Sequence, residues 1–351
     1  MVLTTAIVVL VLIVAAVLYP KVRDHFSTAD YSGAGTGTVS VTVGSGDSAA
    51  DIAQTLVDHG VVKSTKAFVK AADADPSSQS IQAGTYNLRS HMSGAAALTA
   101  LLNPASRAAN GDLVVIEGAN LVAVESRLLK ALGQDKKAAI EKALKDVANS
   151  GVPLGYAPDG SANGMPTSIE GFLYPATYHV SKNESPADAV QQMTGAFIAQ
   201  DRSSGFALDA AKAGLTPYQA LIIASIAQSE AKYPEDMAKV ARVIMNRLAA
   251  QMPLKIDATS VYGAEITGQD PKKVDFATID SPYNSYRHSG LPPTPISNPG
   301  ADALAAAVHP TAGDWLYYVN GDKDGHLFFT NSEAAFLQAA KKCRENNWGC
   351  A

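Results

Sequence analysis

The sequence is short of charge. Charged residues make up 17% of the 351 residues, against roughly 25% in an ordinary soluble chain. The 28 Lys and Arg residues are outnumbered by 33 Asp and Glu residues, and the basic ones form no run. A nucleic-acid partner requires a concentrated basic face that displaces counterions. The composition therefore argues against nucleic-acid binding.

Cysteine is almost absent. Cys343 and Cys350 are the only two, and neither has a His or Cys neighbour at the spacing of a zinc site. We therefore expect no structural metal, and nothing in the sequence predicts a cofactor. Outside the cytoplasm the two cysteines could close a short loop as a disulfide, and two free thiols are the alternative.

One long apolar run stands apart from the rest of the chain. Val2 to Leu18 contains no charge and as a helix would rise about 25 Å, the low end for a hydrocarbon core of roughly 30 Å. Tyr19 follows as an interfacial ring. A signal peptide is the alternative, but it would need a basic start and a small-residue cleavage site, and neither is clear. The run favours a transmembrane anchor at residues 1–19.

Two basic residues that follow this run affect the predicted orientation of the anchor in the membrane. Lys21 and Arg23 follow it directly, where the positive-inside rule would place the cytoplasm. We expect a basic cytoplasmic tail upstream of Met1 to outweigh them. The chain is then a single-pass protein of the plasma membrane with its bulk outside the cytoplasm.

The remaining patterns predict an α+β protein in several parts. Residues 20–38 are rich in Gly, Ser and Thr and indicate a linker. The next part, with alternating Val39, Val41 and Val43, predicts a βααβ unit. We divide the folded chain into this unit at 39–105, an intermediate α+β region at 106–210 and a final region at 211–351.

The final region carries the clearest local signals. Thr216 to Gln219 form a capping box with Pro217 at the first helical position, and Pro234 must stop this helix or start another. A proline-rich loop at 280–300 has a length typical of functional loops. Two apolar and aromatic runs around Gly321 to Gly325 predict a β-hairpin.

Glu230 is the candidate general acid. It lies four residues after Ile226 and seven after Ile223, which places it on the apolar face of the helix. Desolvation and the negative end of the helix dipole both predict a raised carboxyl pKa. A Glu that stays protonated near neutral pH can protonate a leaving oxygen. The alternatives are an ion pair with Arg242 or Lys232, or a side chain that reaches water.

Other titratable residues carry weaker signals. Glu170 precedes an aromatic stretch and could be structural or functional. The histidines follow no metal or catalytic spacing, so solvated or hydrogen-bonded roles are expected for His288, His309 and His326.

A serine-enzyme motif competes with this interpretation. Ser229 and Lys232 match S-x-x-K, and His288 to Gly290 loosely resemble K-T-G. In that class the serine begins a helix, whereas Ser229 lies near a helix end and Lys232 beside the proline break. The context therefore argues against the motif.

Several linked motifs resemble those of the YceG-like family of endolytic murein transglycosylases. Their order and spacing agree with that family over Glu170 to Thr330. Upstream, residues 170–175 (EGFLYP) resemble the family's EGFLFP stretch, and residues 39–105 resemble its LysM-like subdomain. The matching segments are LIIASIAQSEA (221–231), KVARVIMNRL (239–248), MPLKIDATSVY (252–262), SPYNSY (281–286) and GLPPTPISNPG (290–300).

The resemblance implies an activity and a site. Such an enzyme cleaves peptidoglycan glycan strands between N-acetylmuramic acid and N-acetylglucosamine and leaves 1,6-anhydromuramyl ends, with Glu230 as the one catalytic acid. Family members commonly read E-x-E where this sequence has Gln228 to Glu230, so only the second acid is present. Four motif positions are expected to line the sugar cleft, with hydrogen bonding in loops and strands as the alternative for each: Asp257, Thr259, Asn284 and Tyr286.

The resemblance also implies partners. Peptidoglycan glycan strands are the expected substrate, and peptidoglycan synthases are expected neighbours of an enzyme that ends new strands. A non-catalytic wall-binding scaffold, in which the LysM-like unit holds glycan and the last region only docks, is the competing hypothesis.

Overall fold

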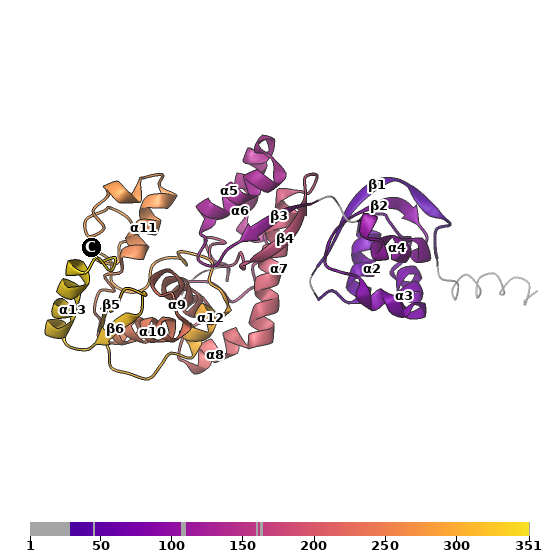
Figure 1. Cartoon of the computed structure of the whole chain (residues 1–351). Helices are drawn as coiled ribbons and strands as arrows, with labels where there is room; N and C mark the ends of the chain where they lie inside the picture. Colours follow the sequence, from indigo (N-terminus) through magenta and orange to yellow (C-terminus); the bar gives the residue numbers. More distant parts are fainter. Residues whose placement is uncertain (1–28, 45, 107–109, 159–160, 162–163, 351) are drawn as a thin grey trace, which may run out of the picture. The chain divides into compact units, whose positions relative to one another are not determined.

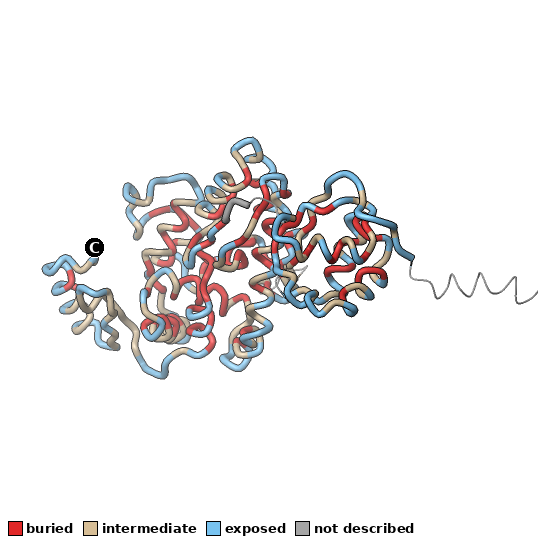
Figure 2. The backbone as a smooth tube through the Cα atoms, turned by 45° about the vertical axis from the view of Figure 1, so that its right-hand side comes forward, coloured by how far each residue is buried: buried red, intermediate tan, exposed pale blue. Residues whose placement is uncertain are grey.

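The computed structural model describes residues 29–350, except 45, 107–109, 159–160 and 162–163. The described chain mixes α-helices with three two-stranded sheets, in keeping with the predicted α+β class. It divides into two compact units, and the boundary along the chain falls between Asn110 and Gly111 (Figure 1). Each unit has its own interior of buried residues (Figure 2).

The predicted membrane anchor at residues 2–18 lies outside the described residues. Among the helices that the structure does describe, none combines the length and the apolar character needed to cross a membrane.

The first unit has the predicted order of strand, two helices and strand. Strands β1 and β2 pair antiparallel, with Val41 opposite Tyr86. Ser48 and Ser64 cap the two helices. Their side-chain oxygens accept hydrogen bonds from backbone N–H groups that would otherwise be unpaired. Its elements are β1 (Ala34–Val43), α2 (Ala49–Asp58), α3 (Thr65–Ala74), β2 (Gly84–Met92) and α4 (Gly94–Leu102). The likeness of this unit to LysM stays a prediction.

The start of this unit differs from the prediction. Strand β1 begins at Ala34, so residues 34–38 of the predicted linker belong to the sheet. Gly35 has a φ of 72°, and a Cβ at this position would collide with the Ser90 carbonyl on the paired strand. Gly35, one of the glycines that suggested a flexible linker, instead allows close approach within the sheet.

The second unit is built around helix α9 (Pro217–Glu230). Helices α8 (Phe206–Lys212), α10 (Pro234–Ala249), α11 (Asp257–Ile266) and α12 (Ala301–Val308) pack against it. One continuous core extends from Leu113 to Val308. The predicted boundary between residues 210 and 211 therefore falls inside a single core.

The rest of the second unit flanks this core. Strand β3 (Asn110–Val115) pairs with β4 (Ala176–Ser181), beside α5 (Leu121–Leu132), α6 (Lys137–Lys145) and α7 (Pro186–Ser204). The predicted hairpin is present as β5 (Tyr317–Asn320) and β6 (Leu327–Thr330). Helix α13 (Glu333–Glu345) follows, and Cys343 is joined to Cys350 by a disulfide.

Candidate active site

Glu230 is the last residue of helix α9. The helix opens as predicted, with Thr216 and Gln219 forming the capping box, and it ends at Glu230 because Pro234 begins α10. Every residue from Ala220 to Ala227 is buried. The helix is therefore buried on all sides rather than on one face, and Glu230 lies at its end, where the helix leaves the core.

The Glu230 carboxyl meets polar groups from two other elements. Although part of the residue stays exposed, protein atoms enclose the carboxyl. The Tyr318 hydroxyl, on β5, donates a hydrogen bond to Oε2 at 2.8 Å. The backbone N–H of Ala258, in the first turn of α11, also donates to this carboxylate. The acid is thus held between the hairpin and α11.

These surroundings change the protonation of Glu230. Burial raises its pKa above the ordinary range, the Tyr318 hydroxyl opposes this rise, and the negative charge of Asp257 adds to it. The direction is the one that the sequence predicts, because desolvation disfavours the charged form of a carboxylate.

The ion-pair alternative for Glu230 finds no support in the contacts of its two candidate partners. Arg242 donates to the backbone carbonyls of Pro310 and Thr311. Lys232 donates to the carbonyl of Asp324.

A second carboxylate lies beside the first. Asp257 opens α11, and its Oδ1 accepts a hydrogen bond of 2.6 Å from the Tyr286 hydroxyl. Both side chains interact electrostatically with Glu230. The structure thus brings together three of the sequence-predicted residues, Glu230, Asp257 and Tyr286, and adds Tyr318.

Thr259 and Asn284 have different surroundings. Both are fully buried. Thr259 Oγ1 donates to the Ile256 carbonyl at 2.7 Å, and Asn284 Nδ2 donates to the Ile279 carbonyl at 2.8 Å. These contacts favour internal hydrogen bonding for both residues, at the start of α11 for Thr259 and within the proline-rich loop for Asn284. Asn284 Oδ1 also accepts from the backbone N–H of Tyr286 at 3.0 Å, so it helps to position that tyrosine.

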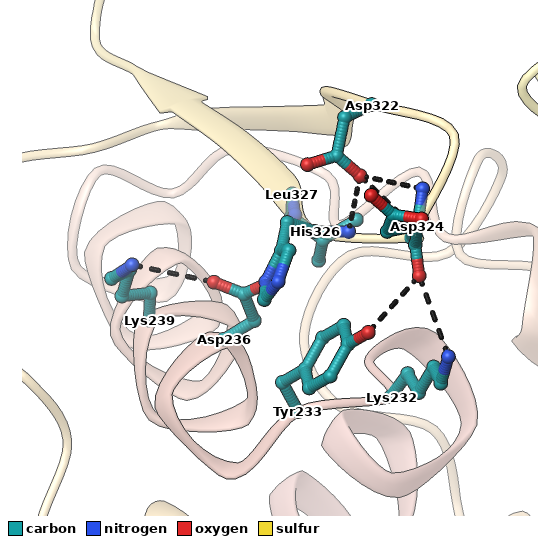
Figure 3. Close-up of polar contacts among 9 residues, drawn as sticks. Lys232, Tyr233, Asp236, Lys239, Asp322, Asp324, His326 and Leu327 are labelled. Atoms are coloured by element: carbon teal, nitrogen blue, oxygen red, sulfur yellow. Dashed lines mark hydrogen bonds and ion pairs between the residues drawn. The ribbon is translucent and has the colours of Figure 1, made fainter.

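The hairpin that carries Tyr318 is fastened to the start of α10 (Figure 3). Asp236 is buried, and its Oδ2 accepts a hydrogen bond of 2.9 Å from the Leu327 backbone N–H. The His326 ring stacks on Tyr233 at 3.9 Å between centroids, and the Tyr233 hydroxyl donates to the Asp324 carbonyl at 3.2 Å. We call Asp236, His326 and Tyr233 the hairpin latch.

Glu170 is the most deeply buried carboxylic acid near this site. It is fully buried, and burial raises its pKa to about 8. The Leu121 backbone N–H donates to Oε2 at 2.8 Å, Asn298 Nδ2 donates to Oε1 at 3.2 Å, and Tyr262 contacts it from α11. Glu170 therefore joins α5, α11 and the proline-rich loop, and these contacts support a structural role.

The competing serine motif is not assembled. Ser229 Oγ donates to the Ser225 carbonyl at 2.9 Å, whereas Lys232 turns to the hairpin at the Asp324 carbonyl. The two side chains are therefore engaged by different partners. His288 is exposed, and His309 pairs with Asp209 at 3.0 Å.

Gln228 occupies the position of the missing first acid. Its Oε1 accepts a hydrogen bond of 2.9 Å from the Gly300 backbone N–H. A Cβ on Gly118 would lie 3.6 Å from Gln228 Cγ. Gln228 therefore packs between two loops, on a different side of the helix end from Glu230.

Comparisons with known proteins identify the family of the chain. The model of the YceG-like family matches residues 41–342. The endolytic murein transglycosylase of Bacillus subtilis strain 168 is 32% identical over 320 residues, which cover 87% of this chain and 84% of that protein. A crystal structure of a yceG-like protein from Listeria monocytogenes superimposes with a TM-score of 0.56 at 26% identity, covering 86% of this chain and 98% of that one.

A second relative matches over a shorter span. The endolytic murein transglycosylase of Streptococcus pneumoniae strain ATCC BAA-255 / R6 is 31% identical over 170 residues. The match covers 47% of this chain and 30% of that protein.

Proposed function

The chain belongs to the YceG-like family, and from this premise we propose that it is a peptidoglycan-cleaving endolytic transglycosylase with Glu230 as its general acid and base. The bond that it cleaves is the one between N-acetylmuramic acid and N-acetylglucosamine, and the new ends are 1,6-anhydromuramyl ends. The observation that carries this proposal is the enclosed Glu230 carboxyl, with a raised pKa and a tyrosine hydroxyl on Oε2.

The proposed reaction needs only one acid. Protonated Glu230 donates its proton to the glycosidic oxygen as the bond from that oxygen to C1 of the muramyl residue breaks. The C6 hydroxyl of the same muramyl residue then attacks C1, and its proton passes to the Glu230 carboxylate. The acid is restored, and no water is consumed. A hydrolase would instead need a positioned water or a second carboxylate as nucleophile.

Asp257 supports this reaction electrostatically. Its negative charge lies close enough to Glu230 to favour the protonated acid, and it can also stabilise positive charge that develops on the sugar ring. Tyr286 holds Asp257 through the 2.6 Å hydrogen bond. We propose that Asp257 and Tyr286 face the substrate, whereas Thr259 and Asn284 hold the loops that carry them.

The proposal includes the setting of the enzyme. Residues 2–18 anchor it in the plasma membrane with its bulk outside the cytoplasm, where it meets new glycan strands beside peptidoglycan synthases. The apolar run and the expected substrate support this arrangement.

Product analysis tests the proposal. Native protein incubated with peptidoglycan should yield muropeptides with anhydro ends, each one water lighter than a hydrolysed end in mass spectrometry. Glu230→Gln, which cannot donate the proton, should lower the rate at least about 100-fold. Gln228→Glu, two residues away on the same helix, is the matched control and should keep anhydro products.

Two other outcomes would point elsewhere. Reducing ends in place of anhydro ends would indicate a muramidase. Intact glycan after incubation with folded native protein would favour the non-catalytic scaffold.

A further inference from the structure

A groove of about 720 Å³ lies between α5 and α11 in the second unit. Its walls come from the loop before α5, from the outer face of α5 and from the end of α11. The groove is large enough for part of an oligosaccharide, since ligand clefts usually have volumes of about 300 to 1,000 Å³.

The groove has both apolar and polar walls. Ile116 and Val122 line it and are 51% and 47% exposed, unusually high for such large aliphatic side chains. Two amides, Asn120 and Gln269, and three carboxylates also line it: Glu117, Glu265 and Asp270. A sugar ring offers the matching surface, with C–H groups on its faces and hydroxyl groups at its edge.

The charge of the groove restricts its ligand. None of the described residues that line it is Lys or Arg. A phosphate or carboxylate would find no cationic partner there and would meet like charge from Glu117 and Glu265. A neutral ligand rich in hydroxyl and amide groups fits the groove better than an acidic one.

Helix α11 connects the groove with Glu230. Asp257, Val261 and Glu265 follow one another at intervals of four residues and share one face of the helix. At the first end of this face, the Ala258 N–H contacts Glu230. At the other end, Glu265 Oε2 accepts a hydrogen bond of 2.6 Å from Asn120 Nδ2. The face extends about 12 Å from Asp257 to Glu265.

A second connection runs beneath the groove. Gly118 lines the groove and packs against Gln228, which lies two residues before Glu230 on α9. This contact places the groove beside the last turn of α9, the helix that carries the proposed acid.

We propose that this groove is a saccharide subsite, which holds sugar residues of the glycan strand on one side of the bond cleaved at Glu230. This inference rests on the proposed function, because it takes the glycan strand as the substrate. An enzyme that cuts within a strand must hold sugars beyond the two that it separates. The absence of basic side chains among the described lining residues favours the sugar backbone over the carboxylates of the stem peptides.

Blocking the groove tests the inference. Ser126 lines it on the exposed side of α5, one turn after Val122, so Ser126→Trp would fill it without disturbing a core. The matched control is Leu208→Trp, because Leu208 is 71% exposed on α8 and does not line the groove. Thermal unfolding midpoints equal to that of the parent would show that both variants fold.

Binding is measured in a Glu230→Gln background with peptide-free glycan strands of two lengths, one of two sugars and one of at least eight. Ser126→Trp should weaken binding of the long strand at least tenfold and leave the short strand unchanged, whereas Leu208→Trp should change neither. Unchanged binding of the long strand by folded Ser126→Trp protein would overturn the subsite. Equal weakening for both lengths would overturn it too.

Failure of the proposed function gives a different result. It would appear as the absence of anhydro ends with native protein, which is a measurement of products. The subsite is judged by glycan binding to a variant that does not turn over, so each result stands alone.

Discussion

At the scale of single residues, the pairing of each site carboxylate with a tyrosine governs the chemistry. Tyr318 donates to Glu230 and Tyr286 to Asp257. A hydroxyl that donates to a carboxylate favours the charged form. Tyr318 therefore opposes the effect of burial and keeps the acid strong enough to give up its proton.

Replacement of this tyrosine should change the pH profile. Tyr318→Phe removes the donor, so the pKa of Glu230 should rise further, because the charged carboxylate loses a hydrogen bond that stabilises it. The general acid then stays protonated to higher pH, so the alkaline limb of the pH profile of kcat should shift to higher pH. The value of kcat at the optimum should fall severalfold. Initial rates of anhydro-end formation across pH would measure both effects.

The neighbouring tyrosine provides the control. Tyr317 lies on the other face of β5 and stacks on Phe336. Tyr317→Phe should leave the alkaline limb where it is in the native protein. A limb that moves equally in both variants, or in neither, would contradict a specific role for Tyr318.

At the scale of elements, the hairpin latch determines where Tyr318 lies. Asp236→Ala removes the acceptor of the Leu327 N–H, and an unpaired buried donor costs about 1 to 3 kcal/mol. We expect faster hydrogen exchange at Leu327 and a lower kcat with little change in KM. The experiment combines hydrogen exchange with steady-state kinetics.

Glu235 supplies the matched substitution for this experiment. It is exposed and lies in the same first turn of α10. Glu235→Ala removes the same charge from the helix N-terminus but leaves the latch intact. If the Leu327 amide of Asp236→Ala exchanges at the same rate as in the native protein, the latch does not hold the hairpin.

Helices and strands whose ends are marked by capping residues or prolines could be predicted from the sequence, and the others could not. The bounds of α9 follow from Thr216, Pro217 and Pro234, whose effects act within one turn. Helix α11 gave no such signal, because Ile256 at its N-cap has no side-chain acceptor and Thr259 and Val261 are β-branched.

The site was predictable to a similar extent. The spacing of isoleucines before Glu230 indicated a desolvated acid. Its hydrogen bond to Tyr318 joins positions 88 residues apart, and no periodicity reports such a contact. Thr259 and Asn284 matched motif positions, but only the fold shows that their side chains are used inside the loops.

At the scale of the whole molecule, each of the two units has its own core and can therefore have its own free energy of unfolding. The larger unit contains Glu170, whose folded pKa of about 8 exceeds the ordinary value of 4.5. The folded state therefore binds one more proton than the unfolded state between these two pH values. The stability contribution is fully present below pH 4.5 and is lost as pH rises through about 8.

This proton linkage gives a prediction for each unit. From pH 4.5 to 8 the larger unit should lose up to about 5 kcal/mol through Glu170, at about 1.4 kcal/mol per pH unit. Glu170→Gln should remove this slope, while the first unit keeps its own pH dependence. Hydrogen exchange at core amides near Leu221 and Leu56, followed against pH, separates the two units. An unchanged slope near Leu221 in Glu170→Gln would refute the assignment.

The distance along the chain between Glu230 and Tyr318 also has a consequence for biosynthesis. The acid and its hydrogen-bond donor are 88 residues apart, and the acid comes first along the chain. A chain that emerges from its amino end therefore presents Glu230 long before the hairpin can reach it. The site is complete only after the hairpin has been made and has folded against α9, so a chain that stops before the hairpin would carry the acid without the tyrosine that tunes it.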